Sequence, residues 1–109
     1  GQTGTTVPSF TLNATSVAET SNLTATINYG DYSIKDLWLG VYNEGDVCGT
    51  GMGTVNPMNK TVLTGQTSVA LQKLPAGRYY ATIMGDGTQY GQVYFTVTDV
   101  EKTQKIQTI

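Results

Sequence analysis

The sequence predicts an all-β protein, a single Greek-key β-sandwich of about seven strands. Short segments in which apolar and polar residues alternate recur along the chain, separated by turn-forming residues at intervals of roughly 8–12 residues. The chain has 13 Gly and seven Tyr but only 13% charged residues, so the Glu, Lys and Arg that favour helices are scarce. No segment shows the helical period of apolar residues.

The first half of the chain predicts two strands before the central one. Apolar residues alternate with polar ones in 10–14 and again in 23–28, which is the period of a strand with one buried face. The polar segment 16–21 breaks the pattern between them, and 31–35 is expected to turn the chain into the next strand.

The segment 36–46 contains the only tryptophan and the densest apolar run, and it predicts the central strand. Successive side chains of a strand point to opposite faces, so its alternate aliphatic residues are expected in the core. These are Leu37, Leu39 and Val41. The other face then holds Trp38 and Tyr42, either under a loop or exposed, with Gly40 between them leaving room for another group to approach. The opposite assignment, with Trp38 in the core, stays open.

The second half predicts four more strands, at 61–63, 68–74, 79–84 and 92–98. They follow the glycine-rich irregular segment 44–60, and loops of that length are often functional or contain a short edge strand. The inward side chains share one alternating pattern. They are Val69, Leu71, Tyr79, Ala81, Ile83, Val93, Phe95 and Val97.

Two turn signals connect these strands. The sequence LPAGRYY at 74–80 predicts a corner at which the Tyr79 hydroxyl bonds back to upstream backbone. The sequence GDGT at 85–88 predicts a tight hairpin, because Asp-Gly tolerates positive φ angles.

The length of 109 residues fits one domain with one core. We expect a flexible lead-in at 1–6, the sandwich at 7–98, and a C-terminal extension or linker at 99–109.

Composition excludes several classes of function. A net charge of −2 with six scattered basic residues excludes nucleic acid as a partner. No apolar run approaches the roughly 20 residues that span a bilayer, so we expect no membrane insertion. Histidine is absent and Cys48 is the only cysteine, which removes the usual catalytic triads and the common zinc ligand sets. We therefore predict no enzyme, no catalytic residue, no cofactor and no metal site.

The remaining motifs are weak. The glycine-rich segment 49–54 lacks the spacing of a phosphate-binding loop, which favours a flexible loop. Without histidine or a basic neighbour, Cys48 is interpreted as an unreactive thiol. The carboxylates near the central strand lack calcium-loop spacing and are interpreted as solvated turn residues.

Five aromatic residues are the candidate ligand or partner face, because flat rings with polar edges bind sugars and proteins well. They are Trp38, Tyr42, Tyr80, Tyr90 and Tyr94. Ordinary sheet surface or contact between domains is the favoured interpretation, since β-sheets accept aromatic residues without a functional cause.

The sequence DLWLGVY at 36–42, followed by EGD at 44–46, resembles the DWIGIY-type strand and KGD turn of bacterial extracellular immunoglobulin- or fibronectin-like sandwich domains. These domains often lie beside secreted catalytic modules. The LPAGRYY corner and the closing FTV strand at 95–97 resemble the second half of that family, and the same order is distantly similar to the SKICH domain. The chain differs by the inserted Leu37 and by its glycine-rich loop. The resemblance covers 36–98 and implies a non-catalytic accessory or targeting module.

We therefore expect a non-catalytic accessory module of a larger bacterial protein that is secreted, periplasmic or at the cell surface. It would act as a spacer or docking domain, with neighbouring domains or another protein as partners. The alternative is a carbohydrate-binding module that uses the five aromatic residues. A small carboxylate-dependent hydrolase is a third and weaker alternative, because a domain of this size leaves little room for a cleft.

Overall fold

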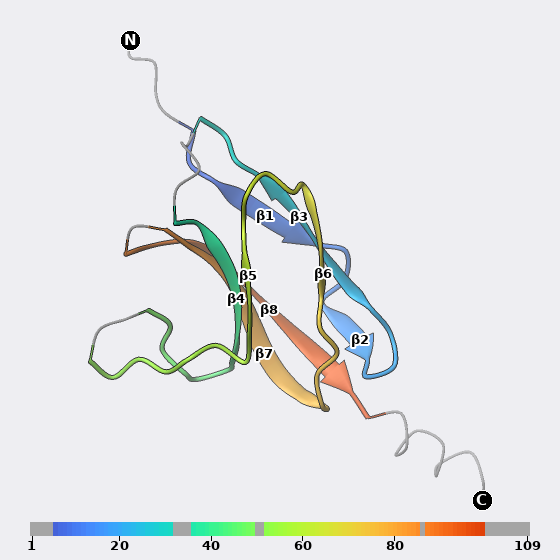
Figure 1. Ribbon diagram of the computed structural model, residues 1–109. Helices are drawn as coiled ribbons and strands as arrows, with labels where there is room; N and C mark the ends of the chain where they lie inside the picture. Colours follow the sequence, from blue (N-terminus) through green and yellow to red (C-terminus); the bar gives the residue numbers. More distant parts are fainter. Residues whose placement is uncertain (1–5, 32–35, 50–51, 86, 100–109) are drawn as a thin grey trace, which may run out of the picture.

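The computed structural model describes residues 6–31, 36–49, 52–85 and 87–99, and this part of the chain contains eight strands and no helix (Figure 1). The strands are β1 Ser9–Leu12, β2 Ser16–Ala18, β3 Leu23–Asn28, β4 Trp38–Asn43, β5 Asn59–Val62, β6 Ser68–Leu71, β7 Gly77–Gly85 and β8 Thr88–Thr98. The all-β prediction is confirmed, with one strand more than expected.

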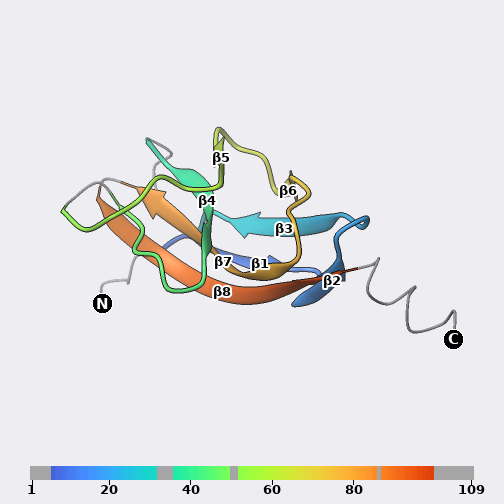
Figure 2. The same cartoon turned by 90° about the horizontal axis from the view of Figure 1, so that it is seen from below.

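The strands form two sheets in a sandwich-like arrangement. One sheet has the order β1-β3-β6 and the other β2-β8-β7-β4-β5. All pairs are antiparallel except β2 with β8. Figure 2 shows β7 and β8 as long, curved strands that lie across from β1 and β3. Long antiparallel strands twist and bend, so this sheet wraps partly around the core.

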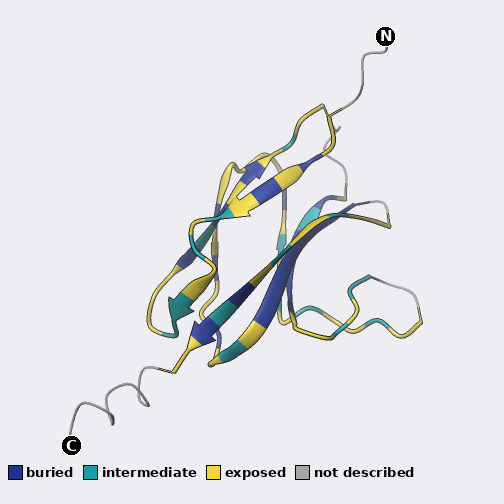
Figure 3. Ribbon diagram, turned by 180° about the vertical axis from the view of Figure 1, so that it is seen from behind, coloured by how far each residue is buried: buried dark blue, intermediate teal, exposed yellow. Residues whose placement is uncertain are grey.

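The core lies between the two sheets, and the alternation of the sequence predicts it well. Buried and exposed residues alternate along β1 and β3 (Figure 3). On the central strand, Leu37, Leu39 and Val41 are all buried in the core cluster. The predicted face of that strand is confirmed, and Trp38 lies outside the core cluster. The eight residues expected to point inward in the second half also contact this core.

The corner before β7 forms as predicted. The Tyr79 hydroxyl donates a hydrogen bond of 2.6 Å to the carbonyl oxygen of Pro75. The Tyr79 ring itself is buried and stacks on Phe95 of β8, with ring centroids 5.7 Å apart. The same side chain therefore fills the core and fixes the turn.

The expected break at 16–21 is wrong at its first three residues, because Ser16–Ala18 forms β2. This strand pairs in parallel with the end of β8, and the Thr96 amide donates to the Thr15 carbonyl at 2.9 Å. The Glu19 amide donates to the Thr98 carbonyl at 3.1 Å. A three-residue strand is too short to show a period, and its partner lies some 80 residues away along the chain, so the sequence pattern gave no signal.

Tyr90, one of the five candidate face residues, does not lie on the outer face, and a β-bulge is the reason. Thr82 pairs with Gln92, but the next residue, Ile83, pairs with Tyr90, so Gly91 is an extra residue with φ of 85°. One inserted residue reverses the faces of all residues before it. Tyr90 therefore packs against the core, whereas Tyr94 stays outside.

The remaining connections agree with the sequence where they are described. Gly85 pairs with Thr88, which confirms the hairpin, although Asp86 lies outside the described residues. Most of the predicted turn at 31–35 and part of the loop at 49–54 also lie outside them. The lead-in and the C-terminal extension remain predictions. Thr6 is described, and its carbonyl accepts a hydrogen bond of 2.9 Å from the Asp31 amide.

Candidate binding surface on the five-stranded sheet

Three tyrosines form a row across the outer face of the five-stranded sheet. Tyr42 of β4 pairs with Tyr80 of β7, which pairs with Tyr94 of β8. The rings of Tyr42 and Tyr80 are stacked with centroids 5.4 Å apart, and those of Tyr80 and Tyr94 are tilted at 5.5 Å. Such pairs across neighbouring strands stabilise a sheet beyond the area that they bury.

The loop between β4 and β5 covers two of these rings. The Tyr80 hydroxyl donates a 2.6 Å hydrogen bond to the Asp46 carbonyl, and Cys48 lies against Met84 of β7. Tyr42 is 1% exposed and Tyr80 is 2% exposed, whereas Tyr94 is 49% exposed. The row is therefore buried at one end and open to solvent at the other.

Burial governs the chemistry of the covered phenols. Desolvation raises the pKa of Tyr80 to about 12, and the nearby Cys48 thiol adds to the rise. Desolvation also raises the pKa of Tyr42, although the nearby Gly49 amide acts in the opposite direction. The Tyr42 hydroxyl has no hydrogen bond of standard geometry with the described residues. Both phenols keep their protons at neutral pH.

Trp38 lies half-buried on the same outer face, at the other end of β4 from Tyr42. A Cβ on Gly40 would lie 2.6 Å from Cζ3 of Trp38 and 3.1 Å from Cε1 of Tyr42. The space that Gly40 leaves is thus filled by the two neighbouring rings. The Lys60 ammonium lies 4.7 Å from the centroid of the indole, a cation–π contact.

A shallow hollow lies beside this tryptophan at the edge of the sheet. Its lining includes Trp38, Lys60 and Val62, together with Asp36 from the chain just before β4. Asp36 has a φ of 57°, a conformation that non-glycine residues adopt infrequently. The hollow therefore combines one aromatic ring with one charge of each sign.

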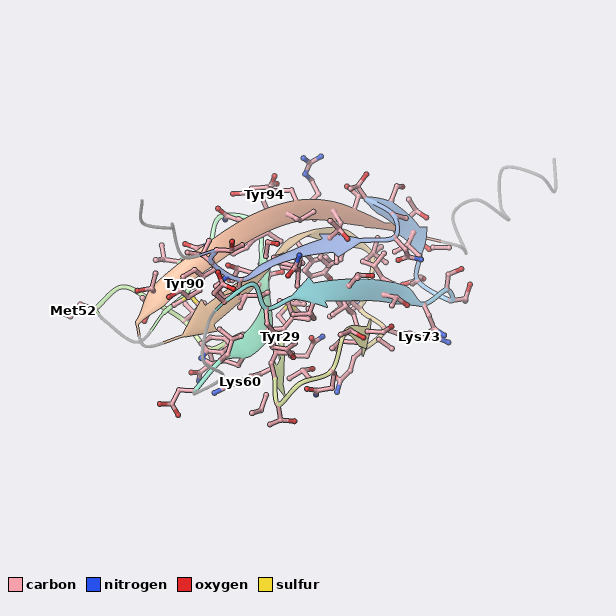
Figure 4. The ribbon with its side chains drawn as sticks, turned by 90° about the horizontal axis from the view of Figure 1, so that it is seen from above. Tyr29, Met52, Lys60, Lys73, Tyr90 and Tyr94 are labelled. Atoms are coloured by element: carbon pink, nitrogen blue, oxygen red, sulfur yellow. The ribbon has the colours of Figure 1, made fainter. Side chains whose placement is uncertain are left out.

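The structure separates the five predicted face residues. Tyr42 and Tyr80 lie under the loop, and Tyr90 contacts the core. Figure 4 shows Tyr94 on the outer side of β8 and Tyr90 on the other side of that strand. Trp38 and Tyr90 are partly exposed and Tyr94 is 49% exposed, so Trp38 and Tyr94 are the two that keep access to solvent on the outer face. Their role as a ligand face stays a prediction.

Sequence reasoning missed several exposed apolar side chains on the β4–β5 loop and on the edge strand β5. These are Val47, Met52, Val55, Met58 and Val62. Met52 is fully exposed at the far tip of the loop (Figure 4). The sequence shows these valines and methionines among the glycines of the loop. The loop was nevertheless interpreted as flexible on the basis of its glycines alone.

Arg78 and Glu44 form an ion pair of 2.9 Å whose side chains are largely solvated, so it contributes little stability. The described residues contain no group of three or more His, Cys, Asp or Glu side chains placed to hold a metal ion. They also contain no helix long and apolar enough to cross a membrane.

Comparison of the sequence with protein-family models and with curated proteins finds no match.

Proposed function

We propose that the chain is a non-catalytic sandwich module, of the immunoglobulin- or fibronectin-like kind, in a larger secreted or cell-surface bacterial protein. Its role is that of a spacer that transmits tension between the domains joined to its two ends. The observation that carries the proposal is the parallel pairing of β2 with β8, which joins the first part of the chain directly to the last.

The direction of these strands supports a load-bearing role. The strand β1 begins at one end of the domain and β8 ends at the opposite end (Figure 1). Force applied through the two ends therefore acts along β2 and β8 in opposite directions. The hydrogen bonds between parallel strands are then loaded together in shear, instead of breaking one after another.

The strand order supports the immunoglobulin-like part of the proposal. The strands β8, β7 and β4 are neighbours in one sheet, and β1 and β3 are neighbours in the other. This order matches the G-F-C and A-B neighbours of immunoglobulin sandwiches, and the hydrogen bond from Tyr79 to Pro75 matches their tyrosine corner.

A carbohydrate-binding role has less support. Its aromatic platform is reduced to Trp38 and Tyr94, because the loop covers the two rings between them. Trp38 lies four residues from Tyr42 along β4, a separation of roughly 13 Å, and Tyr94 lies level with Tyr42 two strands away. The two open rings are too far apart to stack on the same sugar.

Single-molecule force spectroscopy on tandem copies of the domain tests the spacer. The critical variant is Glu19→Pro, which removes the amide that bonds to the Thr98 carbonyl. The matched control is Glu19→Ala, because both variants lose the carboxylate that accepts from the Ala76 amide. We expect a lower rupture force for Glu19→Pro than for Glu19→Ala. Equal rupture forces in the two variants would contradict the proposal.

A further inference from the structure

The strand β5 is the last strand of the five-stranded sheet, so one of its edges faces away from its neighbour β4. The Leu63 amide donates to the Leu37 carbonyl on the β4 side. Neighbouring residues of an antiparallel strand direct their backbone groups to opposite edges, so the Val62 amide and carbonyl point away from β4. Backbone groups open in this way are a template for the addition of another strand.

The side chain of Gln66 binds two of the groups at this edge. Its Nε2 donates to the Val62 carbonyl at 3.1 Å, and its Oε1 accepts from the Thr64 amide at 2.6 Å. An added strand would bind the same carbonyl and the same amide through its own backbone. The Gln66 carboxamide therefore takes the place of a neighbouring strand at the end of β5.

Tyr29 fixes the turn from which this side chain extends. Its hydroxyl donates to the Gln66 carbonyl at 2.7 Å and accepts from the Gly65 amide at 3.1 Å. Tyr29 directly follows β3, and its ring packs against the core. Gly65 has a φ of 121°, which favours glycine at this position of the turn. The backbone of Gln66 is thus held in place from the opposite sheet.

The side chains of this edge favour association. Val62 is 59% exposed and Met58, just before β5, is 43% exposed. The half-buried Trp38 pairs with Val62 across the two strands. An added strand would cover part of this apolar surface, and such burial is favourable. Lys60 is the one charged side chain of β5, and a single lysine on an edge opposes pairing only in part.

We propose that Gln66 blocks the free edge of β5 and thereby prevents the chain from pairing, edge to edge, with a second copy of itself. A second copy is the partner because it offers the same strand, and two β5 strands related by a two-fold axis would run antiparallel and join the two sheets. The net charge of −2 is too small to keep two copies apart. This role does not depend on the spacer function.

Sedimentation velocity of the purified domain over a series of concentrations tests the proposal. Gln66→Ala removes both hydrogen bonds, and Gln66→Asn keeps the carboxamide but is one methylene too short to make both. The matched control is Gln72→Ala, at another exposed glutamine. We expect the wild type and the control to be monomeric. Both Gln66 variants should dimerise, with a dissociation constant at least tenfold below that of any wild-type dimer.

A second substitution identifies the edge that pairs. Val62→Pro removes the amide at the free edge of β5 and leaves the bonds to β4 in place, so it should return Gln66→Ala to a monomer. A dimer that persists in this double variant would overturn the proposal, as would a Gln66 variant that associates no more than Gln72→Ala.

Hydrogen exchange in the wild-type protein gives a readout that does not depend on the folding of any variant. The Thr64 amide should exchange more slowly than the amide of the exposed turn residue Thr20, because Gln66 binds it. Equal exchange of the two amides would show that the carboxamide does not occupy the edge in solution, and the proposal would fail.

Discussion

The Tyr79 hydroxyl donates a 2.6 Å hydrogen bond to the carbonyl oxygen of Pro75, four residues earlier in the chain. Removing that hydroxyl in Tyr79→Phe leaves the ring in the core and the Pro75 carbonyl without its donor. We expect a loss of about 0.5–1.5 kcal/mol in the free energy of unfolding, measured with urea. The control is Tyr94→Phe on the exposed end of the tyrosine row, which should change stability by less. If Tyr79→Phe lowered the free energy of unfolding no more than Tyr94→Phe does, the hydrogen bond at the corner would contribute nothing to stability.

Gly40 lies between two rings that leave no space for a methyl group. We expect Gly40→Ala to destabilise the protein by about 1–3 kcal/mol and to shift the fluorescence of Trp38, the only tryptophan. The cost should be smaller in a Trp38→Phe background, because phenylalanine lacks the Cζ3 atom that lies nearest. Equal costs in the two backgrounds would mean that the indole does not cause the clash.

The Lys60 ammonium lies over the Trp38 ring. Lys60→Met keeps most of the aliphatic stem and removes the charge, so we expect a loss of about 0.5–1 kcal/mol and a change in tryptophan emission. Lys73→Met, at another exposed position, is the control and should have neither effect. Unchanged emission in Lys60→Met would argue against the cation–π contact in solution.

The raised pKa of Tyr80 predicts a loss of stability in alkali. The unfolded chain releases this proton near pH 10 and the folded chain only near pH 12. Between these values the unfolded state binds fewer protons, so the free energy of unfolding falls with a slope of up to about 1.4 kcal/mol per pH unit. Urea unfolding across this range measures the slope. Tyr80→Phe should make this slope less steep. Part of the slope should remain, because the pKa of Tyr42 is also raised. An unchanged slope in Tyr80→Phe would contradict the assignment of the alkaline loss of stability to Tyr80.

Residues whose environment depends on strand period alone could be predicted. Leu37, Leu39 and Val41 follow from simple alternation, and the corner at Tyr79 follows from a local turn with a tyrosine at a fixed offset. Both signals lie within a few residues of the chain, so no knowledge of distant partners was needed.

The features that were missed depend on a strand partner far away in the chain or on a single inserted residue. β2 exists because it reaches β8, and no local pattern marks it. Tyr90 changes face because of one extra residue, Gly91, and alternation cannot locate such a bulge without the partner strand. Whether the outer rings are covered or exposed could not be predicted, for the same kind of reason. The sequence places Tyr42 and Tyr80 on the outer face but does not show that the loop folds back over them.

The pairing of β2 with β8 is the central claim, and hydrogen exchange measured by NMR tests it most directly. The amides of Glu19 and Thr96 donate to carbonyls across this pair. We expect both to exchange far more slowly than the amide of the exposed turn residue Thr20, since only opening of the sheet frees them. Exchange of the Glu19 amide as fast as that of Thr20 would show that β2 does not hold the end of β8, and the spacer proposal would fail with it.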